Sequence, residues 1–84
     1  MEELFLKKVE EVRNLTYKPK NEELLELYAF FKQSTEGNCT KDEPSYFNLK
    51  ERAKYFEWKK IENMEKEMSM KLYVKLVDKL LDKN

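Results

Sequence analysis

The sequence contains no histidine, one cysteine and one glycine, and each scarcity excludes a kind of site. Without histidine the chain lacks the usual general base and the commonest metal ligand, so Ser-His and Cys-His nucleophile pairs are excluded. One cysteine cannot form a zinc site or an intrachain disulfide, and one glycine cannot build a glycine-rich phosphate loop. The acidic residues are dispersed in helix-surface patterns, where ion pairing and solvation explain them. We therefore expect no enzymatic activity, no metal and no cofactor.

The chain also lacks a surplus of either charge and any long apolar run. Its 17 Lys and Arg residues balance 17 Asp and Glu residues, which gives a formal net charge of +0. Because nucleic-acid backbones are bound through an excess of basic residues, we expect no nucleic-acid partner, although a local basic pocket is compatible with this balance. No apolar run approaches the roughly 18 residues that span a bilayer, and the first residues lack the uncharged core of a signal peptide. We expect a cytoplasmic protein without membrane insertion.

The chain does have enough apolar residues for one small core. With 84 residues, 40% of them hydrophobic, it can form a single domain over residues 1–84 and no second one. No stretch shows the alternation that is typical of a strand, and no segment is repeated. Four stretches instead carry apolar residues at helical spacing, which predicts an all-α fold of four helices.

Local signals set the limits of the first two helices. An apolar stripe predicts the first helix over about residues 3–15. The second begins after Asn21, which we expect to cap it, and ends at Glu36 because Gly37 supplies the left-handed residue that commonly closes a helix. Residues 38–45 are polar and aperiodic, which predicts a long connection. The second and third helices therefore need not be antiparallel neighbours.

The third and fourth helices occupy the C-terminal half. Asn48 and Glu51 have the spacing of a capping box, and the third helix is expected to end near Glu62 and Asn63. The fourth helix carries the clearest apolar stripe, formed by Met70, Tyr73, Val74, Val77, Leu80 and Leu81.

The most informative segment lies in the second helix, where Tyr28, Phe31 and Lys32 share one helical face. Such a group suits a nucleotide, because the rings can stack on a base, the ammonium can pair with a phosphate and the tyrosine can donate a hydrogen bond. Aromatic residues on a helix more often fill a core, however. The spacing by itself favours a core role and leaves the nucleotide site open.

Here the sequence resembles the acyl-coenzyme A-binding protein family, also called the diazepam-binding inhibitor family, over nearly the whole chain and without a gap. Two runs carry most of the resemblance: Tyr-x-x-aromatic-Lys-Gln-small-Thr-x-Gly from Tyr28 to Gly37, and Ala-Lys-aromatic-x-x-Trp from Ala53 to Trp58. Further matches are spread along the chain, at Phe5, Val9, Val12, Leu15, Pro19, Glu23, Leu24, Leu25, Leu27, Pro44, Lys50, Tyr73 and Val77.

The resemblance implies four helices in an up-down-down-up arrangement and a non-enzymatic function: intracellular binding, buffering and transport of long-chain fatty acyl-coenzyme A esters. It implies that the phosphorylated adenosine head is bound by Tyr28, Phe31, Lys32 and Lys54, with Arg13 and Tyr73 also lining the site. The acyl tail is expected in an apolar groove between helices, where three methionines could adapt to it or simply fill the core: Met64, Met68 and Met70. We expect a monomer that makes transient contact with enzymes using acyl-coenzyme A.

A few residues depart from the family pattern. Phe31 stands where the family usually has tyrosine, so a hydroxyl is lost and binding should weaken without vanishing. Tyr55 replaces a usual tryptophan, and Arg13 keeps the charge of a usual lysine. Asn63 replaces a usual glycine and is the next-best residue for a left-handed helix end. Cys39, in the connection, is expected to be an incidental free thiol.

Two other functions remain open from the residues. The aromatic face could receive the helix of a partner protein, which would make the domain a helical interaction module. Such a groove has no reason to gather Lys32 and Lys54 around Tyr28, so these cations discriminate between the two hypotheses. A membrane-surface role ranks last, because charges of both signs are mixed along each helix.

Overall fold

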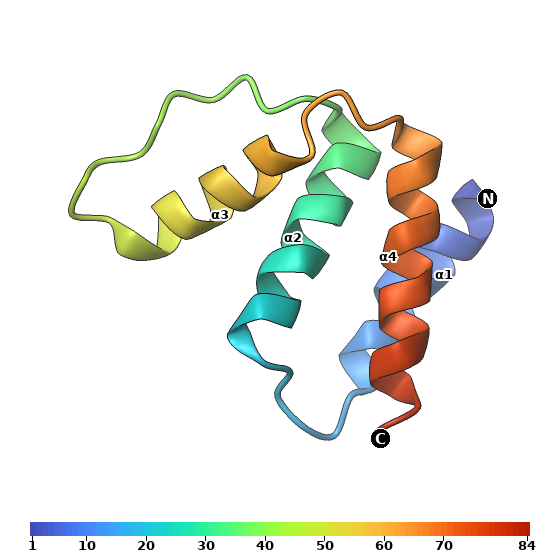
Figure 1. The fold of residues 1–84 in the computed structure, drawn as a ribbon. Helices are drawn as coiled ribbons and strands as arrows, with labels where there is room; N and C mark the ends of the chain where they lie inside the picture. The colour runs from blue at the N-terminus through green and yellow to red at the C-terminus, as the bar shows by residue number, and fades with distance from the viewer.

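The computed structural model describes all residues, 1–84, and contains four α-helices and no strand (Figure 1). The helices are α1 (Glu2–Glu11), α2 (Asn21–Glu36), α3 (Leu49–Lys60) and α4 (Lys66–Leu81), and a short 3₁₀ helix, η1 (Val12–Asn14), follows α1. This confirms the all-α fold that the helical spacing predicted. None of the helices is both long and apolar enough to cross a lipid bilayer.

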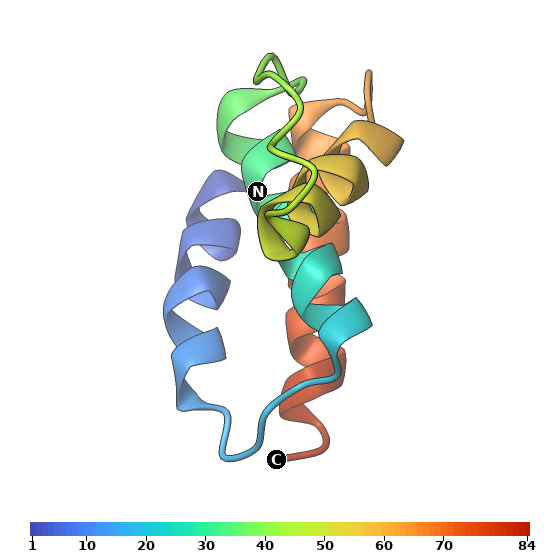
Figure 2. The same cartoon turned by 90° about the vertical axis from the view of Figure 1, so that its left-hand side faces the viewer.

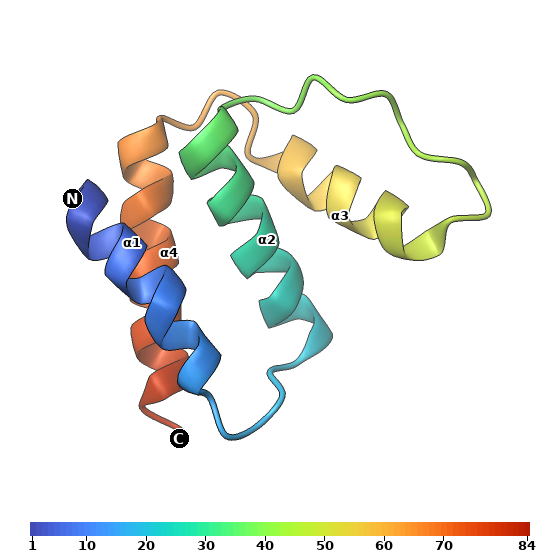
Figure 3. The same cartoon turned by 180° about the vertical axis from the view of Figure 1, so that it is seen from behind.

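The helices run up-down-down-up, as the resemblance implied. In Figure 1, α2 and α3 run in the same general direction while α1 and α4 run the opposite way. A long connection, residues 37–48, carries the chain back from the end of α2 to the start of α3. Figure 3 shows α1 lying across α4. In the same view α2 stands between α4 and α3, and α3 leans away from the other three helices.

The main core lies where α1 and α2 both pack on α4. Its buried residues come from three helices: Phe5 from α1, Leu27 from α2, and Tyr73, Val74, Val77 and Leu80 from α4. More than half therefore belong to the apolar stripe on α4. The stripe predicted for the fourth helix is therefore the one that faces the core, because residues at this spacing share one side of a helix. Met70 packs against the same cluster.

A second, smaller core joins α3 to α2 and consists of Ala29, Cys39 and Trp58. Trp58 is 2% exposed and is the only buried residue of α3. Its indole Nε1 donates to Gln33 Oε1 at 2.9 Å and to the Gly37 carbonyl at 3.0 Å. Cys39 is a free thiol, as expected, but it is not incidental to the fold, because it is 4% exposed and packs in this cluster.

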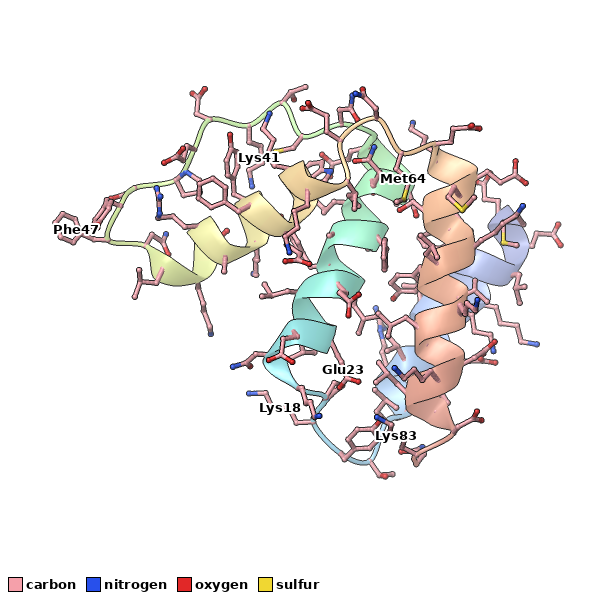
Figure 4. The ribbon with its side chains drawn as sticks, viewed as in Figure 1. Lys18, Glu23, Lys41, Phe47, Met64 and Lys83 are labelled. Carbon is pink, nitrogen blue, oxygen red and sulfur yellow. The ribbon has the colours of Figure 1, made fainter.

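Gln33 extends this junction to the neighbouring loops. Its Nε2 donates to Asn38 Oδ1 and to the Met64 carbonyl, both at 2.9 Å. Asn38 Nδ2 in turn donates to Asn63 Oδ1 at 3.0 Å. A single buried amide thus links the start of the long connection to the turn between α3 and α4, where Figure 4 places Met64. Figure 2 shows both loops at the same end of the molecule.

Two predicted helix limits need correction. The first helix does not stay regular to residue 15, because α1 ends at Glu11 and η1 ends at Asn14. Asn84, at the other end of the chain, holds this region: its Oδ1 accepts from the Thr16 N–H at 2.7 Å, and its Nδ2 donates to the Asn14 carbonyl at 3.2 Å.

The cap of α2 also differs from the prediction. Asn21 is the first helical residue and Lys20 is the N-cap. The Glu23 carboxylate accepts the Lys20 N–H at 2.9 Å, which is the reciprocal half of a capping box. This bond, followed by the nearby charge of Lys83, holds the pKa of Glu23 below its ordinary value. Figure 4 shows Glu23 and Lys83 side by side where α2 begins and α4 ends, with their charged atoms 3.7 Å apart.

Other local signals are confirmed in part: α3 ends at Lys60, shortly before the predicted Glu62 and Asn63, and only the Asn48 half of its capping box is formed. Asn48 caps α3, and its Oδ1 accepts the Glu51 N–H at 3.4 Å. Asn63 has a φ of 72°, the left-handed conformation expected after α3. Gly37 also has a positive φ, 82°, but its ψ of −147° lies in a region that is essentially restricted to glycine.

The Trp58 junction predicts that Trp58→Phe destabilises the protein strongly. The substitution leaves Gln33 Oε1 and the Gly37 carbonyl without their donor and opens a cavity, for a loss of about 2–4 kcal/mol in the free energy of unfolding. Urea denaturation measures this loss. Phe47→Leu is the control, because Phe47 is 90% exposed at the outer end of the connection (Figure 4) and its change should fall within about 0.5 kcal/mol. Equal losses in the two variants would contradict the role of the junction.

The buried phenol of Tyr73 predicts a loss of stability in alkali. Burial raises the pKa of Tyr73 above its ordinary value, so the folded state holds this proton more tightly than the unfolded state does. The contribution is complete below about pH 10, the pKa of an unfolded tyrosine, and falls as the pH rises through the folded pKa. Between about pH 8 and about pH 11 the wild type should therefore lose more of its free energy of unfolding than Tyr73→Phe does.

Urea denaturation at both pH values tests this. Tyr46→Phe is the control, because Tyr46 is exposed. A constant difference between Tyr73→Phe and the wild type across this range would show that the phenol ionises equally in both states.

Candidate functional site

Two hollows flank α2 and share two of its residues, Leu24 and Tyr28. The first, of about 520 Å³, lies between η1, the following loop, α2 and α4, and the second, of about 380 Å³, lies between α2 and α3. Both are mostly apolar. Because Leu24 and Tyr28 lie one helical turn apart, they form a common wall between the two spaces.

The first hollow collects four of the six residues predicted for the site. It is lined by Val12, Arg13, Leu15, Tyr17, Pro19, Leu24, Leu27, Tyr28, Phe31 and Tyr73. This hollow exists because α1 packs on α4 rather than along α2. The segment that connects α1 to α2 therefore passes beside a space that no helix fills. Tyr17 helps to close this hollow near the end of α4, because the Tyr17 hydroxyl donates to the Leu80 carbonyl at 2.7 Å.

The aromatic residues of this hollow also belong to the core. The Phe31 ring stacks on Phe5 with centroids 6.0 Å apart and lies 6.3 Å from the Tyr73 ring. Tyr73 is 4% exposed and meets the Phe5 ring edge-on at 5.0 Å. Phe31 therefore keeps one side for the core and presents the other to the hollow, while Tyr73 contributes little surface of its own. Packing of this kind holds the Phe31 ring in a fixed orientation.

Arg13 is the one cation at the first hollow. It lies in η1 and its side chain is exposed, with a guanidinium nitrogen 3.8 Å from the Glu10 carboxylate. An exposed pair at this distance contributes little to stability, so the guanidinium can turn toward a ligand at small cost.

The second hollow brings Lys54 to Tyr28. It is lined by Asn21, Leu24, Leu25, Tyr28, Leu49, Lys50, Ala53 and Lys54. The Lys54 ammonium lies 5.3 Å from the centre of the Tyr28 ring and 3.7 Å from the Glu51 carboxylate. The second contact is too long for a hydrogen bond. Lys54 is therefore oriented by an aromatic face on another helix, within the range of a cation–π interaction.

Lys32 stands outside the lining of both hollows. Its ammonium lies 5.3 Å from the centre of the Trp58 ring and forms an ion pair with Glu36. The hydrogen bond that the Lys32 ammonium donates to the Glu36 carboxylate raises the pKa of Lys32 above its ordinary value, with burial opposing it. The Tyr28 and Trp58 rings meet edge to face at 6.4 Å. Lys32 and Lys54 thus sit against neighbouring rings and come from two helices.

Several lining residues were not identified from the sequence as part of a site. Lys50 was recognised only as a family match, yet it precedes Lys54 by one helical turn on α3, a spacing that could have indicated a shared face. The apolar lining, including Leu24, Leu25 and Leu49, carries no comparable signal, because such residues line a groove or fill a core with the same spacing. The methionines considered for an acyl tail line neither hollow.

The arrangement is suited to binding an elongated ligand with one anionic aromatic end and one apolar end. Rings and cations gather around Tyr28, and apolar walls extend from it on both sides of α2. The hollows contain no nucleophile paired with a base.

Comparison with known proteins gives one family. The family model described as acyl CoA binding protein matches residues 2–77. An acyl-CoA-binding protein from Saccharomyces cerevisiae is 42% identical over 81 residues, which cover 96% of this chain and 93% of that protein. Acyl-CoA-binding protein homolog 1 from Caenorhabditis elegans is 44% identical over 72 residues, which cover 86% of this chain and 84% of that protein.

Solved structures agree with this result. The crystal structure of acyl-CoA-binding protein 2 from Oryza sativa has a TM-score of 0.92 and 38% identity, covering 98% of this chain and 91% of that one. The solution structure of an acyl coenzyme A binding protein from yeast has a TM-score of 0.79 and 41% identity, covering 99% of this chain and 96% of that one. The four helices, their order and these matches together show that the chain belongs to the acyl-CoA-binding protein family.

Proposed function

We propose that this protein binds long-chain fatty acyl-coenzyme A esters reversibly in the cytoplasm, as a monomeric carrier and buffer with no chemical step of its own. The observation that supports this most directly is the junction of two apolar hollows at Tyr28, with Lys54 against its ring and Lys32 against the adjacent Trp58 ring. Such a carrier would hold the ester away from water and release it to enzymes during transient contacts.

The head of the ligand suits the first hollow and the cations beside it. A base can stack on the free side of Phe31 and on Tyr28, with Arg13 at the rim and Tyr73 behind. Lys32 and Lys54 then offer two ammonium groups to the 3′-phosphate from α2 and α3. Phe31 lacks the hydroxyl that the family usually supplies, which would cost about 0.5–1.5 kcal/mol if that hydroxyl bonded the ligand.

The acyl tail suits the second hollow, between α2 and α3. Leu24, Leu25, Leu49 and Ala53 give it an apolar wall. Leu49 is 76% exposed, so a tail lying there would also remove this side chain from water. Each methylene transferred from water contributes about 0.8 kcal/mol, and long chains should therefore bind more tightly than short ones.

The helical interaction module is less well supported. A partner helix would need the aromatic face of α2 to be available, but Phe31 is stacked on Phe5 and Tyr73 is buried. The part of that face which remains open, around Tyr28, is the part with a cation beside it.

We call Lys32 and Lys54 together the phosphate clamp. It predicts that Lys32→Ala and Lys54→Ala each weaken binding of palmitoyl-coenzyme A by about tenfold or more, because a charge-assisted hydrogen bond contributes about 1.5–3 kcal/mol. Calorimetric titration with the ester, free coenzyme A and palmitate measures this, and either half should bind far more weakly than the ester. Affinity should fall as salt is raised. Lys60→Ala, an exposed lysine of α3, is the control. No heat with the ester, or equal affinities in all variants, would rule out the clamp.

The tail hollow predicts that Leu49→Ser weakens binding of palmitoyl-coenzyme A more than that of octanoyl-coenzyme A, because only the longer chain covers this side chain. A difference of about threefold to tenfold is expected from the loss of one leucine that the bound tail covers in part. Leu6→Ser changes an exposed leucine on α1 and serves as the control. Equal effects of Leu49→Ser on both esters would place the tail elsewhere.

A further inference from the structure

Lys32 already has an anionic partner in the free protein. Its ammonium forms an ion pair with Glu36, the last residue of α2, and the pair lies beside the Trp58 ring. The other cation of the proposed clamp differs in this respect, because Lys54 is 3.7 Å from Glu51 and is not hydrogen-bonded to it. A ligand phosphate that uses both lysines therefore competes with one carboxylate, that of Glu36, for the Lys32 ammonium.

The placement of Glu36 is poorly explained by helix stability. A carboxylate at the C-terminal end of a helix faces the negative end of its dipole. An ion pair four residues apart is also weaker when the lysine precedes the glutamate, which is the order of Lys32 and Glu36. With 53% of its side chain exposed, Glu36 contributes little as a surface pair either.

We propose that Glu36 is a built-in competitor of the ligand phosphate at Lys32, which lowers the affinity for the ester and so tunes its release. This inference rests on the proposed function and concerns a residue outside the ligand contacts. Two effects act in the same direction. The phosphate competes with Glu36 for the Lys32 ammonium, and the Glu36 carboxylate remains one helical turn from Lys32, where it repels the doubly charged phosphate.

The competition gives Lys32 and Lys54 different tasks. Lys54, held only by the Tyr28 ring and a long contact to Glu51, is available to the ligand at once. Lys32 changes partner when the ligand arrives and returns to Glu36 when it leaves. A carrier that has to deliver its ligand benefits from such an exchange, because the ammonium that binds the phosphate regains a carboxylate partner when the ligand leaves.

The test is a titration of Glu36→Gln with two ligands, palmitoyl-coenzyme A and the palmitoyl ester of 3′-dephospho-coenzyme A. Glutamine keeps the shape of the side chain and removes its charge. We expect about twofold to fivefold tighter binding of the complete ester, which corresponds to an exposed ion pair, and no gain for the ester that lacks the phosphate. The gain should shrink as salt is raised.

Glu11→Gln is the matched control. It also removes one carboxylate that pairs with a lysine of its own helix, since Glu11 lies 2.8 Å from Lys8, and Lys8 keeps Asp78 at 2.6 Å. This variant should bind both esters as the wild type does. A similar gain in Glu11→Gln, or in Glu36→Gln with the dephospho ester, would show a general effect of net charge and overturn the inference.

The outcomes also separate this inference from the proposed function. Unchanged or weaker binding by Glu36→Gln, together with a large loss in Lys32→Ala, would overturn the competition and leave the carrier function standing. Failure of the wild-type protein to bind the ester would overturn both. Tighter binding that depends on the 3′-phosphate supports both.

Discussion

The two hydrogen bonds from the Trp58 indole are the interaction on which the candidate site depends. They run to Gln33 on α2 and to the Gly37 carbonyl just beyond it, and Trp58 is the only buried residue of α3. Apolar contact alone would hold α3 near α2 without fixing its rotation, because the hydrophobic effect has no direction. Buried donors and acceptors require specific partners, so these bonds set the rotation. That rotation brings Lys54 over Tyr28 and creates the hollow between the helices.

Structural and candidate binding residues alternate on the same turns of α2. Lys32 lies against the Trp58 ring from outside, while Gln33, the next residue, accepts from the indole and donates to both neighbouring loops. Phe31 presents one side to the core and the other to the first hollow. A rigid helix with this division can hold a ligand site without a separate scaffold, because the packing that stabilises the fold also orients the rings.

Most ion pairs of this protein form within one segment of the chain. Six of the nine ion pairs join residues three or four apart on one stretch of chain, so most of the ion pairs are local. The three others connect distant segments, including Lys83 with Glu23 and Arg52 with Glu43. At the candidate site an anionic ligand meets one lysine, Lys32, that already has a carboxylate partner. Its binding is then an exchange of partners, and its strength depends on geometry more than on net charge.

The sequence by itself determined the four helices, the stripe of α4, the Asn48 cap and the positive φ at Gly37 and Asn63, because these depend on spacing and on neighbouring residues. Its resemblance to a family also named six site residues, four of which the structure gathers at one hollow. Only the tertiary structure decided the end of the first helix, which Asn84 ties down, the burial of Cys39, the lining of both hollows and the position of Lys32 beside the Trp58 ring. Periodicity shows which face of a helix is buried, but the partner of that face depends on contacts between residues far apart in the chain.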